Sequence, residues 1–292
     1  MILNYLKLVR VPQWVKNFFV FVPLLFSQHL FDKNYFYTTL FAFAIFCLSS
    51  SLIYLINDII DIEADKAHPT KMNRPLASGA ISSQSALVIA IILIAAIVSL
   101  LPQFNEEFRY FVIAFVLLNI LYSFWFKHIV ILDVFSIAMG FSIRVLAGAV
   151  VISVPISSWL ILTTMFISLF LGVMKRHSEL ILVAESENAP SRKVLSQYSL
   201  NFADQMATVA AAGVIICYAL YTVSERTVSA FGTENLIYTT PFVVYGIFRF
   251  MYLEYISNKG DNTTKIVFSD LQIILTVLIY TITTVLIIYK II

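Results

Sequence analysis

An acidic segment followed by basic residues, at positions 57–79, holds the side chains best suited to chemistry in this sequence. Asp58, Asp61 and Asp65 are spaced three and four residues apart. If one helix continues through all three, their side chains fall within about 60° of one face. Carboxylates grouped in this way suit Mg²⁺, which binds one or two of them together with substrate phosphates. We therefore predict that the three carboxylates hold Mg²⁺ against a phosphorylated substrate.

Basic and amide side chains in the same segment could bind the phosphates. Lys71 and Arg74 follow the acids, and Asn57 precedes them. Pro69 and Pro75 restrict the backbone, so the basic side chains are expected to be held in place. We expect Lys71 and Arg74 to bind a diphosphate and Asn57 to hydrogen-bond a phosphate or a ribose hydroxyl.

Other polar and charged side chains lie at the ends of apolar runs or within them. Charges at membrane depth are costly and usually face a polar cavity, which makes them functional candidates. The alternative for each is a structural role, as an interfacial anchor or a flanking charge. The candidate binding residues are Lys16, Asn17, Tyr122, Lys127, Arg144, Lys175, Arg176 and Glu179. Asp133 lies in the same apolar run as Arg144 and could reach the active site, and Tyr198 and Asp204 could line the same cavity. Arg249 and Asp270 are expected instead to form a structural pair.

The composition indicates a polytopic membrane protein. Of the 292 residues, 60% are hydrophobic and 12% are charged, whereas soluble domains are about half apolar and one quarter charged. A membrane-spanning helix needs about 20 mostly apolar residues. Nine segments meet this requirement: about 14–31, 35–56, 82–101, 108–126, 129–152, 157–174, 202–223, 237–256 and 270–289. We predict an all-α protein with nine transmembrane helices in one domain, residues 1–292.

The distribution of lysine and arginine predicts the orientation, because cytoplasmic loops carry an excess of both. With the N-terminus inside, 13 of these residues fall on the inner side and 4 on the outer side. The polar loops at about 57–81 and 175–201 are then cytoplasmic. The net charge of +2 gives no argument for nucleic acid. The two cysteines lie in apolar runs and offer neither a disulfide framework nor a zinc site.

The segment at 57–79 also resembles the first signature of the UbiA prenyltransferase superfamily. The resemblance is carried by Asn57-Asp58-x-x-Asp61-x-x-x-Asp65, His68-Pro69 and Arg74-Pro75-Leu76-Ala77-Ser78-Gly79. It implies a helical bundle around a central cavity open to the cytoplasmic side. It also implies Mg²⁺ held by Asp58 and Asp61, with Asp65 as a further candidate ligand, against a diphosphate.

The second long loop departs from the usual pattern of that superfamily. Most members carry a second aspartate-rich motif there, whereas this chain has Lys175-Arg176-His177-x-Glu179. It resembles instead the decaprenyl-phosphate phosphoribosyltransferase branch. So do Gln13-Trp14-x-Lys16-Asn17, Tyr122-Ser123 with Lys127, the span from Asp133 to Arg144, and Pro241-Phe242-x-x-Tyr245-Gly246-x-x-Arg249.

The branch implies transfer of a phosphoribosyl group from phosphoribosyl pyrophosphate to a polyprenyl phosphate, for cell-envelope glycan precursor synthesis. This donor carries a diphosphate and a separate 5-phosphate, so it needs a metal–carboxylate site and a separate cationic site. The acceptor phosphate is already anionic at neutral pH, and no strong general base is required. The expected phosphate ligands are Lys71 and Arg74 for the diphosphate, Lys175 and Arg176 for the 5-phosphate, and Lys16, Lys127 or Arg144 for the lipid phosphate.

Two other functions are compatible with the sequence. A UbiA-type prenyltransferase would move an isoprenoid from a prenyl diphosphate to an aromatic or other acceptor, although the missing second aspartate motif argues against it. A transporter or lipid-binding protein would use Arg144 and the acidic segment as an ion path. For the enzyme we expect a multi-pass protein of the cell inner (plasma) membrane with a cytoplasmic N-terminus. An oligomer is compatible with the sequence but is not predicted.

Overall fold

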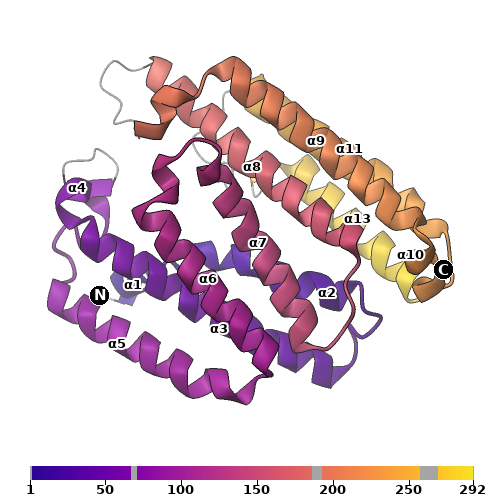
Figure 1. Ribbon diagram of the computed structural model, residues 1–292, viewed down its shortest axis with the longest axis horizontal. Helices are drawn as coiled ribbons and strands as arrows, with labels where there is room; N and C mark the ends of the chain where they lie inside the picture. Colours follow the sequence, from indigo (N-terminus) through magenta and orange to yellow (C-terminus); the bar gives the residue numbers. More distant parts are fainter. Residues whose placement is uncertain (1, 67–70, 186–192, 257–268, 292) are drawn as a thin grey trace. The chain divides into compact units, whose positions relative to one another are not determined.

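The computed structural model describes residues 2–66, 71–185, 193–256 and 269–291, and these residues form helices joined by short turns (Figure 1). The first half contains α1 (Ile2–Leu8), the 3₁₀ helix η1 (Val11–Phe21), α2 (Val22–Leu25), α3 (Lys33–Ile60), α4 (Ile62–Lys66), η2 (Lys71–Asn73), α5 (Ser83–Leu100), η3 (Leu101–Gln103), α6 (Glu106–Phe124) and η4 (Phe126–His128). The second half contains α7 (Leu132–Val151), α8 (Ser158–Glu185), η5 (Lys193–Gln197), α9 (Leu200–Val223), α10 (Glu225–Phe231), η6 (Asn235–Thr239), α11 (Thr240–Tyr255) and α13 (Leu271–Ile288).

Eight helical segments of the described chain are long and apolar enough to cross a membrane. Each overlaps one of the predicted spans, from the second to the ninth. They are Lys33–Ile60, Ser83–Gln103, Glu106–Phe124, Leu132–Val151, Ser158–Val183, Leu200–Val223, Asn235–Tyr255 and Leu271–Ile288. His68, Pro69, Arg192, Lys259 and Lys265, which entered the motif or the charge count, lie outside the described residues.

The first predicted span, 14–31, differs from the expectation. Its residues up to Leu25 fall in η1 and α2, and residues 26–31 lie outside any helix. Pro23 lies in the first turn of α2, where its missing N–H is tolerated, so the chain starts a new helix there. A 3₁₀ helix rises about 2.0 Å per residue, and η1 with α2 therefore extends about 28 Å with only 15 residues.

The described chain divides into two compact units. The first contains Met1–Trp125 and Ile143–Pro155, and the second contains Phe126–Ser142 and Ile156–Ile292. Helix α7 is divided between them, since Leu132–Ser142 belongs to the second unit and Ile143–Val151 to the first.

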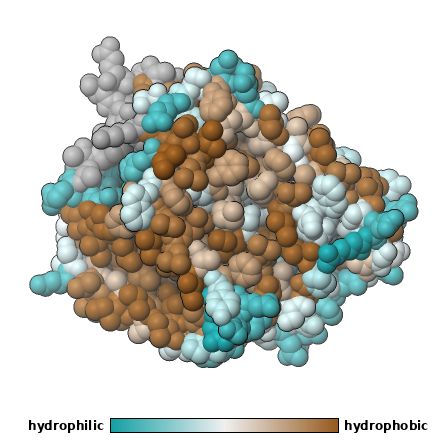
Figure 2. All heavy atoms as spheres, viewed as in Figure 1, coloured by the Kyte–Doolittle hydropathy of each residue, from teal (hydrophilic) through white to brown (hydrophobic). Residues whose placement is uncertain are grey.

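In the first unit, α3 contacts η1, α5 and α6, and Figure 1 shows α5 beside α3. Phe46 of α3 packs edge-on against Phe108 and Phe115 of α6, with ring centroids 6.0 and 5.1 Å apart. One side of α5, which includes Ala86, Ala90 and Leu93, is buried. Most of the large apolar side chains on the rest of the helix are exposed. Figure 2 shows hydrophobic side chains covering this part of the surface. A helix of this kind suits contact with lipid.

In the second unit, α8 and α9 form the most extensive helix pair. The buried side of α9 consists largely of alanines, including Ala203, Ala207 and Ala210. Small residues allow two helices to approach closely. Gly213 is the extreme case, because a Cβ there would lie 2.5 Å from a ring carbon of Phe166. This packing holds the end of α8 that carries Arg176 and His177 against the start of α9.

Candidate active site

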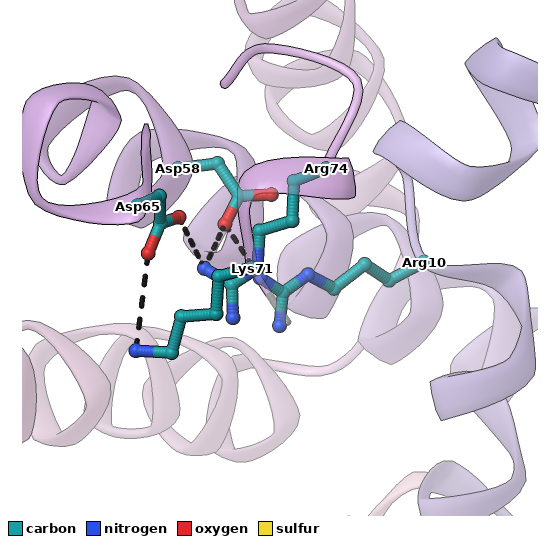
Figure 3. Close-up of polar contacts among 5 residues, drawn as sticks. All are labelled: Arg10, Asp58, Asp65, Lys71 and Arg74. Carbon is teal, nitrogen blue, oxygen red and sulfur yellow. Dashed lines mark hydrogen bonds and ion pairs between the residues drawn. The ribbon is translucent and has the colours of Figure 1, made fainter. Parts of the chain in front are cut away.

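Two buried carboxylates, Asp58 and Asp65, share the guanidinium group of Arg74 in the first unit (Figure 3). Arg74 Nη1 lies 3.1 Å from Asp58 Oδ1 and 2.5 Å from Asp65 Oδ2. Arg10 Nη2 lies 2.5 Å from Asp58 Oδ1, and Lys71 Nζ lies 3.8 Å from Asp65 Oδ1. Asp58 and Asp65 are 3% and 2% exposed, so weak solvent screening strengthens these contacts. Three cations around two carboxylates give this cluster a net positive charge.

The third predicted carboxylate, Asp61, does not join these ion pairs. Helix α3 ends at Ile60, Asp61 is its C-cap, and α4 begins at Ile62. Asp61 forms no side-chain hydrogen bond or ion pair within the described residues. The expected common face assumed one continuous helix, and the break at Asp61 removes that condition. Across the described part of the chain, no three His, Cys, Asp or Glu side chains form a group that could hold a metal ion.

Asp58 and Asp65 nevertheless fit a shared cation. Because both contact the same nitrogen of Arg74, the two oxygens lie no more than about 5.6 Å apart. Mg²⁺ binds oxygen at about 2.0–2.1 Å and takes its remaining ligands from water and phosphate. Two oxygens bound to one Mg²⁺ lie at most about 4.2 Å apart, so a shared ion would take the place that the Arg74 nitrogen occupies between them. The chemistry of this donor pair, oxygens only with basic groups beside them, therefore suits Mg²⁺ bound together with a diphosphate.

A second polar cluster in the first unit joins η1, α3 and α7. Arg144 Nε donates to Asn17 Oδ1 at 2.7 Å, and its guanidinium carbon lies 4.4 Å from the centre of the Phe115 ring. The Asn17 amide donates to Cys47 Sγ and accepts from Ser50 Oγ, both at 3.3 Å. Asn17 is fully buried, so these contacts determine the orientation of its amide and thereby of Arg144.

In the second unit, the fully buried Arg176 lies between two acids. Its Nε is 3.0 Å from Asp133 Oδ2, and its Nη1 contacts Glu179. Tyr198 donates to Asp133 Oδ1 at 2.7 Å and accepts from the backbone N–H of Ile131 at 2.8 Å. Burial, followed by the hydrogen bond to Asp133, raises the pKa of Tyr198. Tyr198 therefore remains a proton donor at neutral pH and holds the Asp133 carboxylate in place.

Comparison with known proteins identifies the family. A model described as the UbiA prenyltransferase family matches residues 18–268. The chain belongs to the UbiA prenyltransferase family. It is a multi-pass membrane transferase, as the eight apolar helices also indicate.

Two relatives are named decaprenyl-phosphate phosphoribosyltransferase. The protein of Mycolicibacterium smegmatis is 35% identical over 224 residues, which cover 75% of this chain and 70% of that protein. The protein of Corynebacterium glutamicum is 34% identical over 220 residues, which cover 74% of this chain and 66% of that protein. The resemblance to this branch of the UbiA family, noted from single motifs, is thus confirmed over about three quarters of the chain.

The fold is that of a solved UbiA homolog from Archaeoglobus fulgidus, whose structure was determined bound to GPP and Mg²⁺. The TM-score is 0.69 at 16% identity, and the alignment covers 98% of this chain and 99% of that chain. The predicted UbiA fold is therefore confirmed at the level of architecture.

The predicted binding residues of this UbiA family member are distributed over both units. The first unit contains Lys16, Asn17, Asn57, Lys71, Arg74, Tyr122 and Arg144, and the second contains Lys127, Lys175, Arg176 and Glu179. Lys175 is exposed whereas Arg176 is buried, because successive helical residues point about 100° apart. Asn57, Tyr122 and Lys127 are half-buried.

Arg10 is not among the site residues predicted from the sequence. Arg10 contacts Asp58, and its guanidinium carbon lies 4.6 Å from the centre of the Tyr54 ring. Its backbone is left-handed, with φ of 53°, which is uncommon for residues other than glycine and occurs often at functional sites. The available sequence signal was its place three residues before the Gln13–Asn17 motif.

The predicted pairing of Arg249 with Asp270 is confirmed. Arg249 Nη2 and Nε donate to the two Asp270 oxygens at 2.8 and 3.2 Å. Asp270 Oδ1 also accepts from the backbone N–H of Ile273 and so caps α13. The bond to Arg249 is the main reason that the pKa of Asp270 is lowered. The pair joins α11 to the start of α13 and has no direct part in the basic clusters.

Proposed function

We propose that this protein is a Mg²⁺-dependent transferase that moves the 5-phosphoribosyl group from phosphoribosyl pyrophosphate to a polyprenyl phosphate and releases pyrophosphate. One observation carries the proposal beyond the names of the relatives. The first unit holds two separate groups of basic side chains, one around Asp58 and Asp65 and one at Lys16 and Arg144. A prenyl diphosphate has a single charged head, whereas two anionic substrates require separate cationic sites.

The proposal includes a location and an architecture. The protein lies in the cell inner membrane with its N-terminus in the cytoplasm. The eight spans and the η1–α2 segment form nine membrane-embedded elements of one domain, in a bundle around a central cavity open to the cytoplasmic side. The product serves cell-envelope glycan precursor synthesis.

Asp58 and Asp65 are the side chains that would hold Mg²⁺, with Asp61 as a third candidate. When bound, Mg²⁺ would neutralise the negative charge that develops on the leaving pyrophosphate. The Mg²⁺ bound by the Archaeoglobus homolog supports the use of a divalent cation. The position of Arg74, whose cationic nitrogen contacts both carboxylates, supports Asp58 and Asp65 as its ligands.

Basic side chains around the two acids bind the diphosphate of the donor. These are Arg74, Lys71 and the newly found Arg10, with Asn57 as a hydrogen-bond donor. Asp58 already orients Arg10 and Arg74, which reduces the reorganisation needed when an anion binds. Their net positive charge also attracts the polyanionic donor from solution.

The 5-phosphate is assigned to Lys175 rather than to Arg176. Arg176 is fully buried between Asp133 and Glu179, and separating such a buried ion pair typically costs about 3–5 kcal/mol. Arg176 and Glu179 therefore support the end of α8 that presents Lys175. Tyr122 and Lys127 are further candidates for contact with either substrate.

Transfer itself requires positioning more than proton removal. An oxygen of the acceptor phosphate attacks C1 of the ribose from the face opposite the pyrophosphate. The new C–O bond forms as the bond to pyrophosphate breaks, and positive charge develops on the sugar ring. Because the phosphate monoester is already anionic, the side chains act by holding the reactants and stabilising the leaving group.

Labelled phosphoribosyl pyrophosphate tests the proposal directly. Purified full-length protein should transfer label to a polyprenyl phosphate in the presence of Mg²⁺ and should not do so after chelation. A parallel reaction should contain a prenyl diphosphate and an aromatic acceptor. Transfer in the second reaction and none in the first would reject phosphoribosyl transfer in favour of prenyl transfer.

A further inference from the structure

The group formed by Lys16 and Arg144 places positive charges together in a poorly hydrated part of the first unit. Lys16 directly precedes Asn17, which accepts a hydrogen bond from Arg144, and the positive charges of Arg144 and Arg10 both act on the Lys16 amine. Within the described residues Lys16 forms no ion pair with a carboxylate. Arg144 is only 8% exposed. Like charges held together out of water repel each other, and a bound anion would relieve that repulsion.

This basic group lies deeper along α3 than the paired acids. Asn17, which accepts from Arg144, contacts Cys47 and Ser50 of α3. These residues precede Asp58 by 11 and 8 positions, a distance of about 12–16 Å along a helix. Since α3 is one of the membrane spans and a hydrocarbon core is about 30 Å thick, the group is well inside the bilayer under the proposed orientation.

Arg10 lies between the two basic groups. It contacts Asp58 directly and lies within electrostatic range of Lys16. Charged side chains therefore follow one another from Asp65 through Arg74, Asp58 and Arg10 to Lys16. An anion at Lys16 would be adjacent to the acidic end without sharing its metal ligands.

A close backbone contact between α7 and η1 fixes the relative position of the elements that carry Lys16 and Arg144. A Cβ built on Gly148 would lie 2.1 Å from the carbonyl oxygen of Val20. Gly148 is one helical turn after Arg144, and Val20 is one 3₁₀ turn after Asn17. The glycine thus permits the approach at which Arg144 reaches Asn17.

We propose that Lys16 and Arg144 bind the phosphate monoester of the polyprenyl phosphate acceptor, with Asn17 orienting Arg144. This inference rests on the proposed phosphoribosyl transfer. The donor also carries a phosphate monoester, its 5-phosphate, so the chemistry alone suits either substrate. The depth of Lys16 and Arg144 in the bilayer favours the acceptor, because the phosphate of a lipid whose polyprenyl chain lies in the bilayer reaches this depth directly. A water-soluble donor is held at the acidic end by its diphosphate.

Binding measurements on the purified full-length protein test this assignment without requiring turnover. Lys16→Met removes the charge, keeps a similar side-chain length, and changes a half-buried position. Lys16→Arg restores the charge. Lys66→Met is the matched control, because Lys66 is an exposed lysine paired with Glu63. The probes are a polyprenyl phosphate, the corresponding polyprenol, ribose 5-phosphate, and phosphoribosyl pyrophosphate with Mg²⁺, with binding followed by native mass spectrometry.

The wild-type protein and Lys66→Met should bind the polyprenyl phosphate at least tenfold more tightly than the polyprenol. Lys16→Met should lose that preference and retain its affinity for the donor, and Lys16→Arg should regain most of the preference. Equal binding of the two lipids by the wild type would overturn the assignment. So would a loss of affinity for ribose 5-phosphate or the donor in Lys16→Met with lipid binding unchanged.

The same measurements separate the two proposals. Lys16-dependent binding of the polyprenyl phosphate, together with no binding of phosphoribosyl pyrophosphate, would support the lipid phosphate site and reject the proposed donor.

Discussion

At the scale of single residues, Asp58 would have two roles in the acidic cluster, as a partner of arginines and as a metal ligand. It is buried in α3 and contacts two arginines, Arg10 and Arg74. The first comes from the turn before η1 and the second from the segment after η2. One carboxylate thus connects three parts of the first unit and would also be a metal ligand, so its substitution affects both the position of the arginines and the charge of the site.

Asp58→Asn should abolish most turnover while the protein still inserts into the membrane. The amide cannot serve as an anionic metal ligand or neutralise the arginines, and we expect a loss of about two to three orders of magnitude. The rate of label transfer from phosphoribosyl pyrophosphate measures it, with membrane content determined by immunoblotting.

Glu63→Gln is the matched control, since Glu63 is exposed and its ion-pair partner among the described residues is Lys66. It should retain the wild-type rate. Turnover of Asp58→Asn at the same rate as Glu63→Gln would remove Asp58 from the site.

At the scale of helices, α7 and η1 of the first unit approach each other closely. Gly148 of α7 meets the backbone of η1 at Val20, next to the bond from Arg144 to Asn17. Backbone atoms cannot move aside as a flexible side chain can. Any added side chain must separate the two elements and disturb the basic group they form.

Gly148→Ala should destabilise the protein by about 1–3 kcal/mol, the usual cost of overpacking. Gly246→Ala in α11 provides the contrast, because no atom lies within 4 Å of a Cβ built there, and alanine favours a helix by up to about 1 kcal/mol over glycine. Thermal unfolding in detergent should therefore give a lower Tm for the first variant and an equal or higher Tm for the second. An unchanged Tm for Gly148→Ala would contradict the close contact.

The pairing of α11 with α13 through Arg249 and Asp270 should depend on pH. The bond lowers the pKa of Asp270 in the folded protein, so its contribution to stability is present above the ordinary aspartate pKa of about 3.9. That contribution is lost as the pH falls through the lower folded value.

Asp270→Asn should thus be less stable than the wild type at pH 7, and the difference should shrink as the pH falls below about 4. Tm values of both proteins across this range check the sign. A difference that grows on acidification would contradict the ion pair.

At the scale of the whole molecule, the hydrophobic side chains exposed over α5 and α6 are those of a lipid-facing surface (Figure 2). The orientation of the protein in the bilayer has its own test at the two ends of the span Ser83–Gln103. Gln84 and Gln103 lie at these ends and are both exposed. Cys47 and Cys217 are buried, so they should contribute little background to thiol labelling.

A membrane-impermeant maleimide added to intact cells should label Gln103→Cys and leave Gln84→Cys unlabelled. Both should react after permeabilisation. The opposite pattern would reverse the proposed orientation and place the acidic cluster outside.

Much of the fold could be predicted from the sequence, whereas little of the geometry of the site could. Eight spans were predicted because each depends on about 20 consecutive apolar residues. The exception was η1 with α2, where the 3₁₀ rise allows a shorter segment to cover a similar length. The spacing of Asp58, Asp61 and Asp65 predicted one face, and the break after Ile60 altered it.

The sequence by itself determined that the chain forms apolar helices and carries acids and bases suited to phosphate and Mg²⁺. Hydropathy and residue type are local properties, so they can be read along the chain. Only the tertiary structure decided that Arg74 joins Asp58 to Asp65, that Arg176 is enclosed by Asp133 and Glu179, and that Arg144 reaches Asn17. These partners are set by how separate helices pack, and spacing along the chain does not encode that packing.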